Sequence, residues 1–156
     1  MGNICRSPTG EGVLRKMVAQ RGLEARIVVD SAGTTGYHVG EKADRRMRAA
    51  AGSRGYPLTG VARQIGPADI DAFSLIVPMD RDNLHDIRRL VADGQPSNHI
   101  QLLSAFLPKG APPDVPDPYY GGPQGFDVVI DMIEDACPVI LRHLLGEPEP
   151  VRGRKP

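Results

Sequence analysis

The sequence predicts an α/β domain in which helices flank a parallel sheet. Short runs of β-branched and apolar residues alternate along the chain with longer segments of helical spacing, and this alternation is typical of a parallel α/β sheet. The apolar runs are continuous, as expected of strands covered on both faces. A length of 156 residues with 40% hydrophobic residues suits one domain, which we expect to span residues 1–145.

Four segments have apolar residues at helical spacing. The first, 8–21, has Ser7 placed as the N-cap, Pro8 at the first helical position and Gly22 beyond the end. Pro138 is expected to kink the last of the four. The other three helical segments are 43–54, 80–92 and 126–145. Three short apolar runs are the predicted strands, at 26–30, 74–77 and 99–103.

Two segments depart from this pattern. Residues 107–125 are rich in Pro and Gly, and a loop of that length in a compact domain is usually a functional lid or a disordered segment. Asp117 lies within it. Residues 146–156 carry prolines and alternating charges that cannot form a core, so we expect a disordered tail there.

Composition limits the classes of partner. Nineteen basic and nineteen acidic residues cancel, which gives no electrostatic support for binding nucleic acid or an anionic membrane. The two cysteines, Cys5 and Cys137, cannot form a disulfide framework. No signal peptide, membrane-spanning run or cluster of metal ligands is recognised in the sequence. We therefore expect a reduced, cytoplasmic protein that binds a small anion and needs no metal or cofactor.

The first residues read as a phosphate-binding turn that leads into a helix. Such a turn points several backbone N–H groups and the positive end of the helix dipole at one place, which favours an oxyanion. The turn comprises Gly2, Asn3, Ile4, Cys5, Arg6 and Ser7. The Arg6 guanidinium adds a planar fork of donors that matches two phosphate oxygens. A capped helix start, with Cys5 packed as a small hydrophobic residue, is the alternative interpretation of this heptad.

Four further motifs follow the turn. Residues 30–40 read Asp-Ser-Ala-Gly-Thr, then Tyr-His-Val-Gly; residues 62–65 read Ala-Arg-Gln-Ile; Met-Asp stands at 79–80, and Asp-Pro-Tyr-Tyr-Gly at 117–121. In their order and spacing these motifs resemble the low-molecular-weight protein tyrosine phosphatase family. The resemblance implies a Rossmann-like parallel sheet flanked by helices. It also implies hydrolysis of phosphotyrosine proteins or small aryl phosphates through a phosphocysteine intermediate, without a metal.

The resemblance assigns roles to several residues. Arg6 matches the arginine that holds the phosphoryl oxygens, and Asp117 matches the acid that protonates the leaving phenolate. Ser7 matches a serine that hydrogen-bonds the nucleophilic sulfur. The aromatic walls of the substrate slot correspond to Tyr37, Tyr119 and Tyr120. For each of these residues an ordinary structural role is the alternative: helix capping for Ser7, a turn for Asp117 and packing for the tyrosines.

In the family, the nucleophilic cysteine lies six positions ahead of the arginine that matches Arg6, with five residues between them, which places it immediately before Met1. Cys5 is adjacent to Arg6 and cannot take its place. The family's central first strand also falls before Met1. Loss of about five buried side chains at roughly 1.5 to 3 kcal/mol each is comparable with the stability of a whole domain. We therefore expect the 156-residue chain to fold poorly and to be inactive, and the true start to lie upstream.

Two other functions remain open. One is a catalytically dead module that binds phosphate or phosphotyrosine through the turn. The other is arsenate reductase, which shares the fold but needs further redox cysteines that Cys137 alone does not supply. Many relatives carry a histidine where this chain has Gly60. Since that histidine binds the asparagine matching Asn3, a less rigid turn is expected here.

Overall fold

The computed structural model describes residues 2–120, 122 and 124–148, without the side chain of Tyr120. The α-helices of this part are α1 (Arg6–Gln20), α2 (Arg45–Ser53), α3 (Pro67–Ala72), α4 (Arg81–Arg88) and α5 (Gln124–Leu145). Two short 3-10 helices are η1 (Leu103–Phe106) and η2 (Pro118–Tyr120). The four predicted helices thus correspond to α1, α2, α4 and α5. The six-residue α3 had no predicted counterpart.

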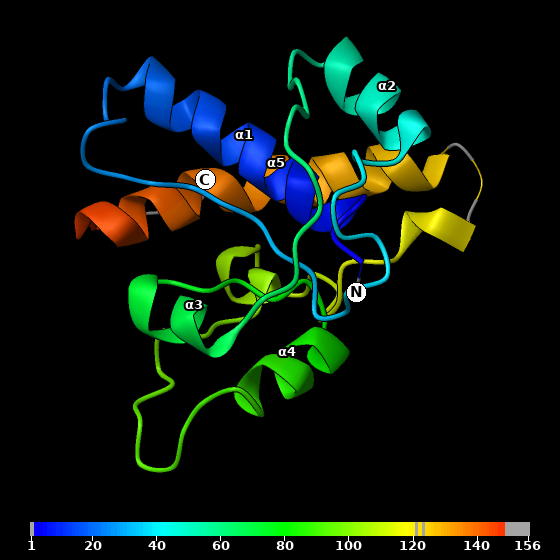
Figure 1. Cartoon of the computed structure of the whole chain (residues 1–156). Helices are drawn as coiled ribbons and strands as arrows, with labels where there is room; N and C mark the ends of the chain where they lie inside the picture. The colour runs from blue at the N-terminus through cyan, green and yellow to red at the C-terminus, as the bar shows by residue number, and fades with distance from the viewer. Residues whose placement is uncertain (1, 121, 123, 149–156) are drawn as a thin grey trace.

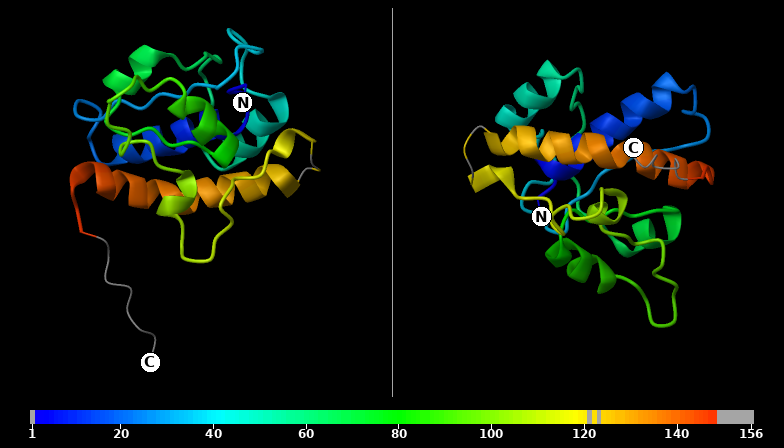
Figure 2. Two further views of the ribbon diagram at one scale, coloured as in Figure 1. Left: turned by 90° about the horizontal axis from the view of Figure 1, so that it is seen from below. Right: turned by 180° about the vertical axis from the view of Figure 1, so that it is seen from behind.

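The helices form two layers. Figure 1 shows α1, α2 and α5 together on one side of the molecule and α3 and α4 on the other. The views in Figure 2 keep the same division. The amino end of the chain lies between the layers (Figure 1), so the turn that precedes α1 is reached by elements of both.

The larger core lies in the layer of α1, α2 and α5. One stripe of α5 is fully buried and includes Val129, Ile130 and Ile133, as the predicted amphipathic pattern requires. This stripe packs with Val13 of α1 and Met47 of α2 in one hydrophobic cluster. A smaller cluster holds the other layer together, and its buried members are Ile70, Ile87 and Ile100.

Helix α1 begins at Arg6 with Cys5 as its N-cap, two residues earlier than predicted. Ser7 is therefore not the N-cap but the second helical residue. Pro8 is accommodated in the first turn because the N–H groups there have no acceptor within the helix. Gly22 adopts φ +63° just beyond the end of α1, in agreement with the predicted stop signal.

The predicted sheet is represented by isolated bridges. The runs 74–77 and 99–103 meet at a parallel bridge between Ile76 and Ile100, which agrees with the predicted direction of pairing. The run 26–30 forms no bridge to any other described residue. It lies across a cavity from 74–77, so the two segments cannot pair directly. The described residues thus do not form a continuous sheet.

Two other boundaries differ from the prediction. The run 99–103 ends as the start of η1, where the Leu103 N–H donates to the Pro78 carbonyl at 2.9 Å. In the predicted tail, Glu147 pairs with Arg21 at 2.9 Å. Residues 149–156 of that tail lie outside the described residues.

Candidate active site

The turn before α1, residues 2–7, borders a cavity of about 170 Å³, which we call the loop cavity. It is lined by Gly2, Asn3, Ile4, Cys5, Arg6, Ser7, His38, Asn83, Asp117 and Tyr119. The structure therefore brings the six predicted loop residues together with two residues from a segment more than a hundred positions away in the sequence.

Backbone donors of the loop are left without acceptors. The N–H groups of residues 3–7 form no hydrogen bond to any other residue that the structure describes. Asn3 has φ 59°, the left-handed conformation that Asn tolerates better than most residues. A left-handed residue followed by a helix start turns successive amides toward one side, as in the backbone nests that bind anions. The loop thus presents a set of free donors to the cavity.

Contacts with the rest of the chain fix the shape of the loop. The Asp44 N–H donates to the Ile4 carbonyl at 2.7 Å. The Asn3 side-chain amide donates to the Ser31 carbonyl at 3.1 Å, and the Ser31 hydroxyl donates to the Glu11 carboxylate at 2.5 Å. Gly60 places no side chain beside Asn3, so Ser31 and Glu11 supply the anchor that the family resemblance assigned to a histidine.

Arg6 is a buried cation held from one edge. Its guanidinium Nη1 donates to Asp80 Oδ2 at 2.5 Å and to the Val115 carbonyl at 2.8 Å, and its side chain is only 7% exposed. The Nε and Nη2 edge makes no hydrogen bond in the described part of the chain, although Nη2 lies 3.8 Å from Asp117 Oδ2. That edge therefore remains available to an oxyanion that enters the loop cavity.

Asp80 has two structural roles. One carboxylate oxygen accepts the Arg6 donor, and the other accepts the Asn83 N–H at 2.7 Å as the N-cap of α4. Asp80 therefore holds Arg6 in place and caps α4 at the same time.

Asp117 and Tyr119 border the cavity from η2 and the residue before it. The Tyr119 N–H donates to Asp117 Oδ1 at 3.0 Å, which leaves Oδ2 directed at Arg6. The Arg46 guanidinium lies over the Tyr119 ring, 5.4 Å from its centroid. In the long predicted loop 107–125, Val115 anchors the approach to Asp117 because its N–H donates to the Met79 carbonyl at 2.9 Å.

The two cysteines are poor nucleophiles in these surroundings. Burial, with additional repulsion from Asp44 and Asp117, raises the pKa of Cys5 to about 12. Burial also raises the pKa of Cys137 to about 12. Both thiols are therefore protonated at neutral pH, and a thiol attacks as its thiolate.

Some predicted site residues lie elsewhere. Tyr37 does not border the loop cavity, and 86% of its surface is exposed, so its place in the substrate slot stays a prediction. The side chain of Tyr120 lies outside the described residues. Sequence reasoning did not assign His38 and Asn83 to the site, although both border the cavity. A Cβ on Gly2 would meet the His38 ring at 2.5 Å, so the glycine permits this close approach.

Neither a metal centre nor a membrane segment emerges from the described residues. No group of three or more His, Cys, Asp or Glu side chains there could hold a metal ion. None of the helices in residues 2–120 and 124–148 is long and apolar enough to cross a membrane.

Comparison with known proteins supplies an independent result. The sequence profile of the low molecular weight phosphotyrosine protein phosphatase family matches residues 1–149. A Synechocystis relative is 46% identical over 144 residues, or 92% of each chain. The low molecular weight protein-tyrosine-phosphatase of Streptomyces coelicolor is 40% identical and covers 98% of this chain and 93% of its own. The human low molecular weight phosphotyrosine protein phosphatase is 36% identical over 142 residues, covering 90% of this chain and 89% of its own.

A solved structure gives the same relationship in three dimensions. A protein tyrosine phosphatase from Entamoeba histolytica, crystallised with Hepes in its active site, superposes with a TM-score of 0.87 at 39% identity. The match covers 94% of both chains. Fold and sequence therefore agree over almost the whole length of the two proteins.

Proposed function

The chain belongs to the low molecular weight phosphotyrosine protein phosphatase family and is by that membership a protein tyrosine phosphatase, and from this premise we propose that its loop cavity binds the phosphoryl group of the substrate. The observation that carries the proposal is the set of unpaired N–H groups of residues 3–7 beside the free edge of Arg6. Phosphoryl oxygens accept from such donors, and a buried cation strengthens each bond.

Asp117 is the proposed general acid. It borders the same cavity as the loop donors, and its Oδ2 is not used by the Tyr119 N–H. The general acid must lie within hydrogen-bond reach of the leaving oxygen. The Tyr119 side chain beside it offers an aromatic wall, which supports an aryl phosphate and hence phosphotyrosine as the substrate.

The proposed reaction needs a thiolate that neither Cys5 nor Cys137 provides. The family pattern assigns this thiol to the position immediately before Met1. Attack of the thiolate on phosphorus forms an S–P bond and breaks the P–O bond to the aryl group, whose oxygen takes the proton of Asp117. Water then attacks phosphorus, its proton passes to the Asp117 carboxylate, and the S–P bond breaks to release phosphate and the thiolate.

Two measurements test this proposal. A form of the protein in which a cysteine stands immediately before Met1 is expected to hydrolyse p-nitrophenyl phosphate. A folded protein of that form without activity would contradict the catalytic proposal. The 156-residue chain alone is expected to bind orthovanadate or inorganic phosphate without turnover, which is also the behaviour of a phosphate-binding module.

Arg6→Lys tests the assignment of the anion site. A lysine cannot donate from two positions of one planar edge, and a hydrogen bond to a charged group contributes about 1.5 to 3 kcal/mol. We expect phosphate affinity to fall about 10- to 100-fold by calorimetry. Arg81→Lys is the matched control, since Arg81 is exposed and pairs with Asp114 outside the cavity. Equal affinities of the two variants would refute the role of Arg6.

A further inference from the structure

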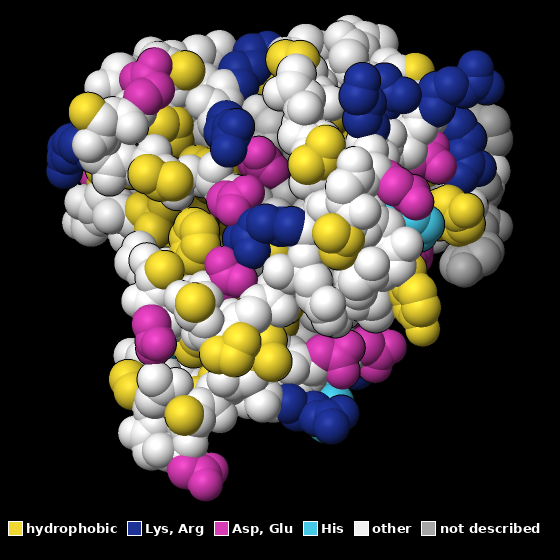
Figure 3. Space-filling model, viewed as in Figure 1, with side chains coloured by type: hydrophobic (Ala, Val, Ile, Leu, Met, Phe, Trp, Pro, Cys, Tyr) yellow, Lys and Arg dark blue, Asp and Glu magenta, His cyan; other side chains and the backbone are white. Residues whose placement is uncertain are grey.

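The start of α2 carries a cluster of exposed basic side chains. In Figure 3 several Lys and Arg side chains gather over this helix. The cluster comes from a single segment of the chain, residues 41–48, and all of its members are exposed. We call it the basic edge, and its members are Lys42, Arg45, Arg46 and Arg48.

Contacts with two residues of the loop cavity fix the position of the basic edge. The Asp44 N–H, between Lys42 and Arg45 in the sequence, donates to the Ile4 carbonyl at 2.7 Å. The Arg46 guanidinium lies over the Tyr119 ring, 5.4 Å from its centroid, and its Nη2 is 3.5 Å from the Tyr119 carbonyl oxygen. Both Ile4 and Tyr119 line the loop cavity. The basic edge therefore lies beside the mouth of this cavity.

The acidic residues of the same segment do not cancel its charge. The Asp44 carboxylate pairs with Arg46 at 3.0 Å, and Glu41 contacts the His38 ring at 2.9 Å. Two acidic residues against four basic ones leave an excess of two positive charges in residues 41–48. The basic edge thus presents a positive field to solvent next to the cavity.

The opposite side of the cavity has no such excess. Helix α4 belongs to the other layer (Figure 1) and lines the cavity with the uncharged Asn83. Beside it, Arg81 pairs with Asp114 at 2.7 Å, and the neighbouring Asp82 is exposed. A ligand that extends out of the cavity therefore meets positive charge on the side of α2 and not on the side of α4.

We propose that the basic edge selects phosphotyrosine segments that carry acidic residues close to the phosphotyrosine. With the phosphoryl group on the loop donors and the ring beside Tyr119, the peptide leaves the cavity where Arg46 lies. Exposed charges act over about 10 Å at 0.1 M salt, or roughly three residues of extended peptide. Carboxylates within that reach are attracted, and basic residues are repelled. This inference deepens the proposed function and rests on it, because the loop cavity fixes where the peptide emerges.

Peptide binding to the full 156-residue chain tests the proposal. The probes are two fluorescein-labelled peptides with a central phosphotyrosine, flanked on each side by three glutamates in one and three glutamines in the other. By fluorescence anisotropy at low ionic strength we expect the glutamate peptide to bind about 3- to 10-fold more tightly. Added salt is expected to reduce this preference. The double variant Lys42→Gln/Arg45→Gln should lose most of it and keep the parent's affinity for inorganic phosphate.

The matched control is Arg88→Gln/Lys109→Gln, which removes the same charge at exposed positions that do not line the loop cavity. This control is expected to keep the preference. Equal affinity of the parent for the two peptides would overturn the inference, and so would a preference that survives in Lys42→Gln/Arg45→Gln. Either result in a chain that binds inorganic phosphate leaves the proposed function standing. A parent chain that binds no phosphate would contradict the proposed function, and the inference with it.

Discussion

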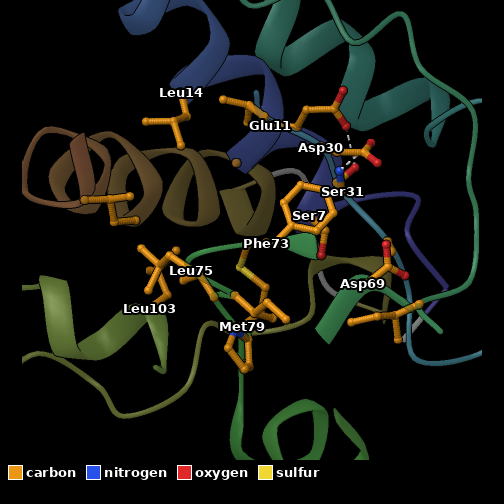
Figure 4. A pocket seen from close by; sticks show the side chains of 18 of the residues that line it. Ser7, Glu11, Leu14, Asp30, Ser31, Asp69, Phe73, Leu75, Met79 and Leu103 are labelled. Atoms are coloured by element: carbon orange, nitrogen blue, oxygen red, sulfur yellow. Dashed lines mark hydrogen bonds between the residues drawn. The ribbon is translucent and has the colours of Figure 1, made fainter. Parts of the chain in front are cut away.

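The loop cavity differs from a second cavity, of about 300 Å³, in how the backbone groups around it are used. This second cavity lies between the segments 26–32 and 73–79, and we call it the apolar slot (Figure 4). In the loop the free N–H groups converge beside a buried cation whose position is fixed by Asp80 and Val115. In the slot the free groups of Leu75 and Val77 face apolar side chains. Unpaired donors beside a buried cation form a site for an anion.

The interactions that fix the shape of the loop differ from those that stabilise the fold. The loop is anchored by Asp44, Ser31 and Glu11, whereas the core is built around the buried stripe of α5. We therefore predict anion binding that depends on the loop residues and stability that depends on the core.

The largest expected effect concerns Asp117. In the form of the protein that turns over, Asp117→Asn removes the proposed proton donor, and general acid catalysis contributes about 10²- to 10⁴-fold. We expect kcat to fall by that factor for phenyl phosphate and by less for p-nitrophenyl phosphate, whose leaving group needs the proton less. Asp114→Asn is the control, since Asp114 pairs with Arg81 at the surface. Unchanged kcat in Asp117→Asn would remove this residue from the mechanism.

The next effect compares the core with the slot. Ile133 is fully buried in α5, whereas Val28 on the slot wall is 80% exposed. We expect Ile133→Ala to lower the free energy of unfolding by about 2 to 5 kcal/mol, and Val28→Ala to change it by less than about 0.5 kcal/mol. Urea unfolding measures both values. Similar losses in the two variants would show that the slot is closed in the folded chain.

A smaller effect is expected at the N-cap of α2. The Asp44 carboxylate accepts from the N–H groups of Arg46 and Met47, and loss of such a cap costs about 0.5 to 2 kcal/mol. Asp44→Ala should show this loss in urea unfolding at pH 7, with the exposed Asp86→Ala as the control.

The same cap has a predicted pH dependence. A hydrogen bond from the Arg46 side chain is the main factor that lowers the pKa of Asp44 below 3.8. The stabilisation is therefore complete above that value and is lost as the pH falls through the lower pKa of the folded state. A difference between Asp44→Ala and the parent that stays constant down to pH 2 would contradict the assignment.

The smallest expected signal is the reactivity of the cysteines. Because burial raises the pKa of Cys5 and Cys137 from 9.0 to about 12, we expect almost no alkylation by iodoacetamide at pH 8 in the folded chain. Two alkylations are expected by mass spectrometry after denaturation. The thiols of the unfolded chain ionise at a lower pH than the buried thiols of the folded chain. The stabilisation that comes from keeping both thiols protonated is therefore complete below about pH 9 and is lost as the pH rises toward 12. Rapid labelling of Cys5 at pH 8 would contradict its buried environment.

Helices and the loop were predictable because their signals are local. The spacing of apolar residues in α5 and the Asp80 cap of α4 depend on near neighbours in sequence. The start of α1 was misplaced because Ser7 and Pro8 resemble a standard cap, whereas the loop begins the helix at Arg6. The positions of His38 and Asn83 at the cavity depend on tertiary contacts that no local pattern contains.

The strands were less predictable for the same reason. A run such as 26–30 indicates that both faces are covered, but it does not say which segment lies beside it. Its pairing depends on tertiary contacts, and it forms no bridge to any other described residue. Tyr37 illustrates a similar limit, since its motif matched the family while its side chain is exposed.

The central claim is that the loop binds an oxyanion by itself. Titration of the ¹⁵N-labelled 156-residue chain with inorganic phosphate, followed by amide chemical shifts, tests this most directly. The account predicts saturable shifts at residues 3–7, little change at Leu75 and Val77, and markedly weaker binding in Arg6→Lys. A dispersed spectrum in which phosphate moves no loop amide, or moves amides of the slot instead, would contradict it.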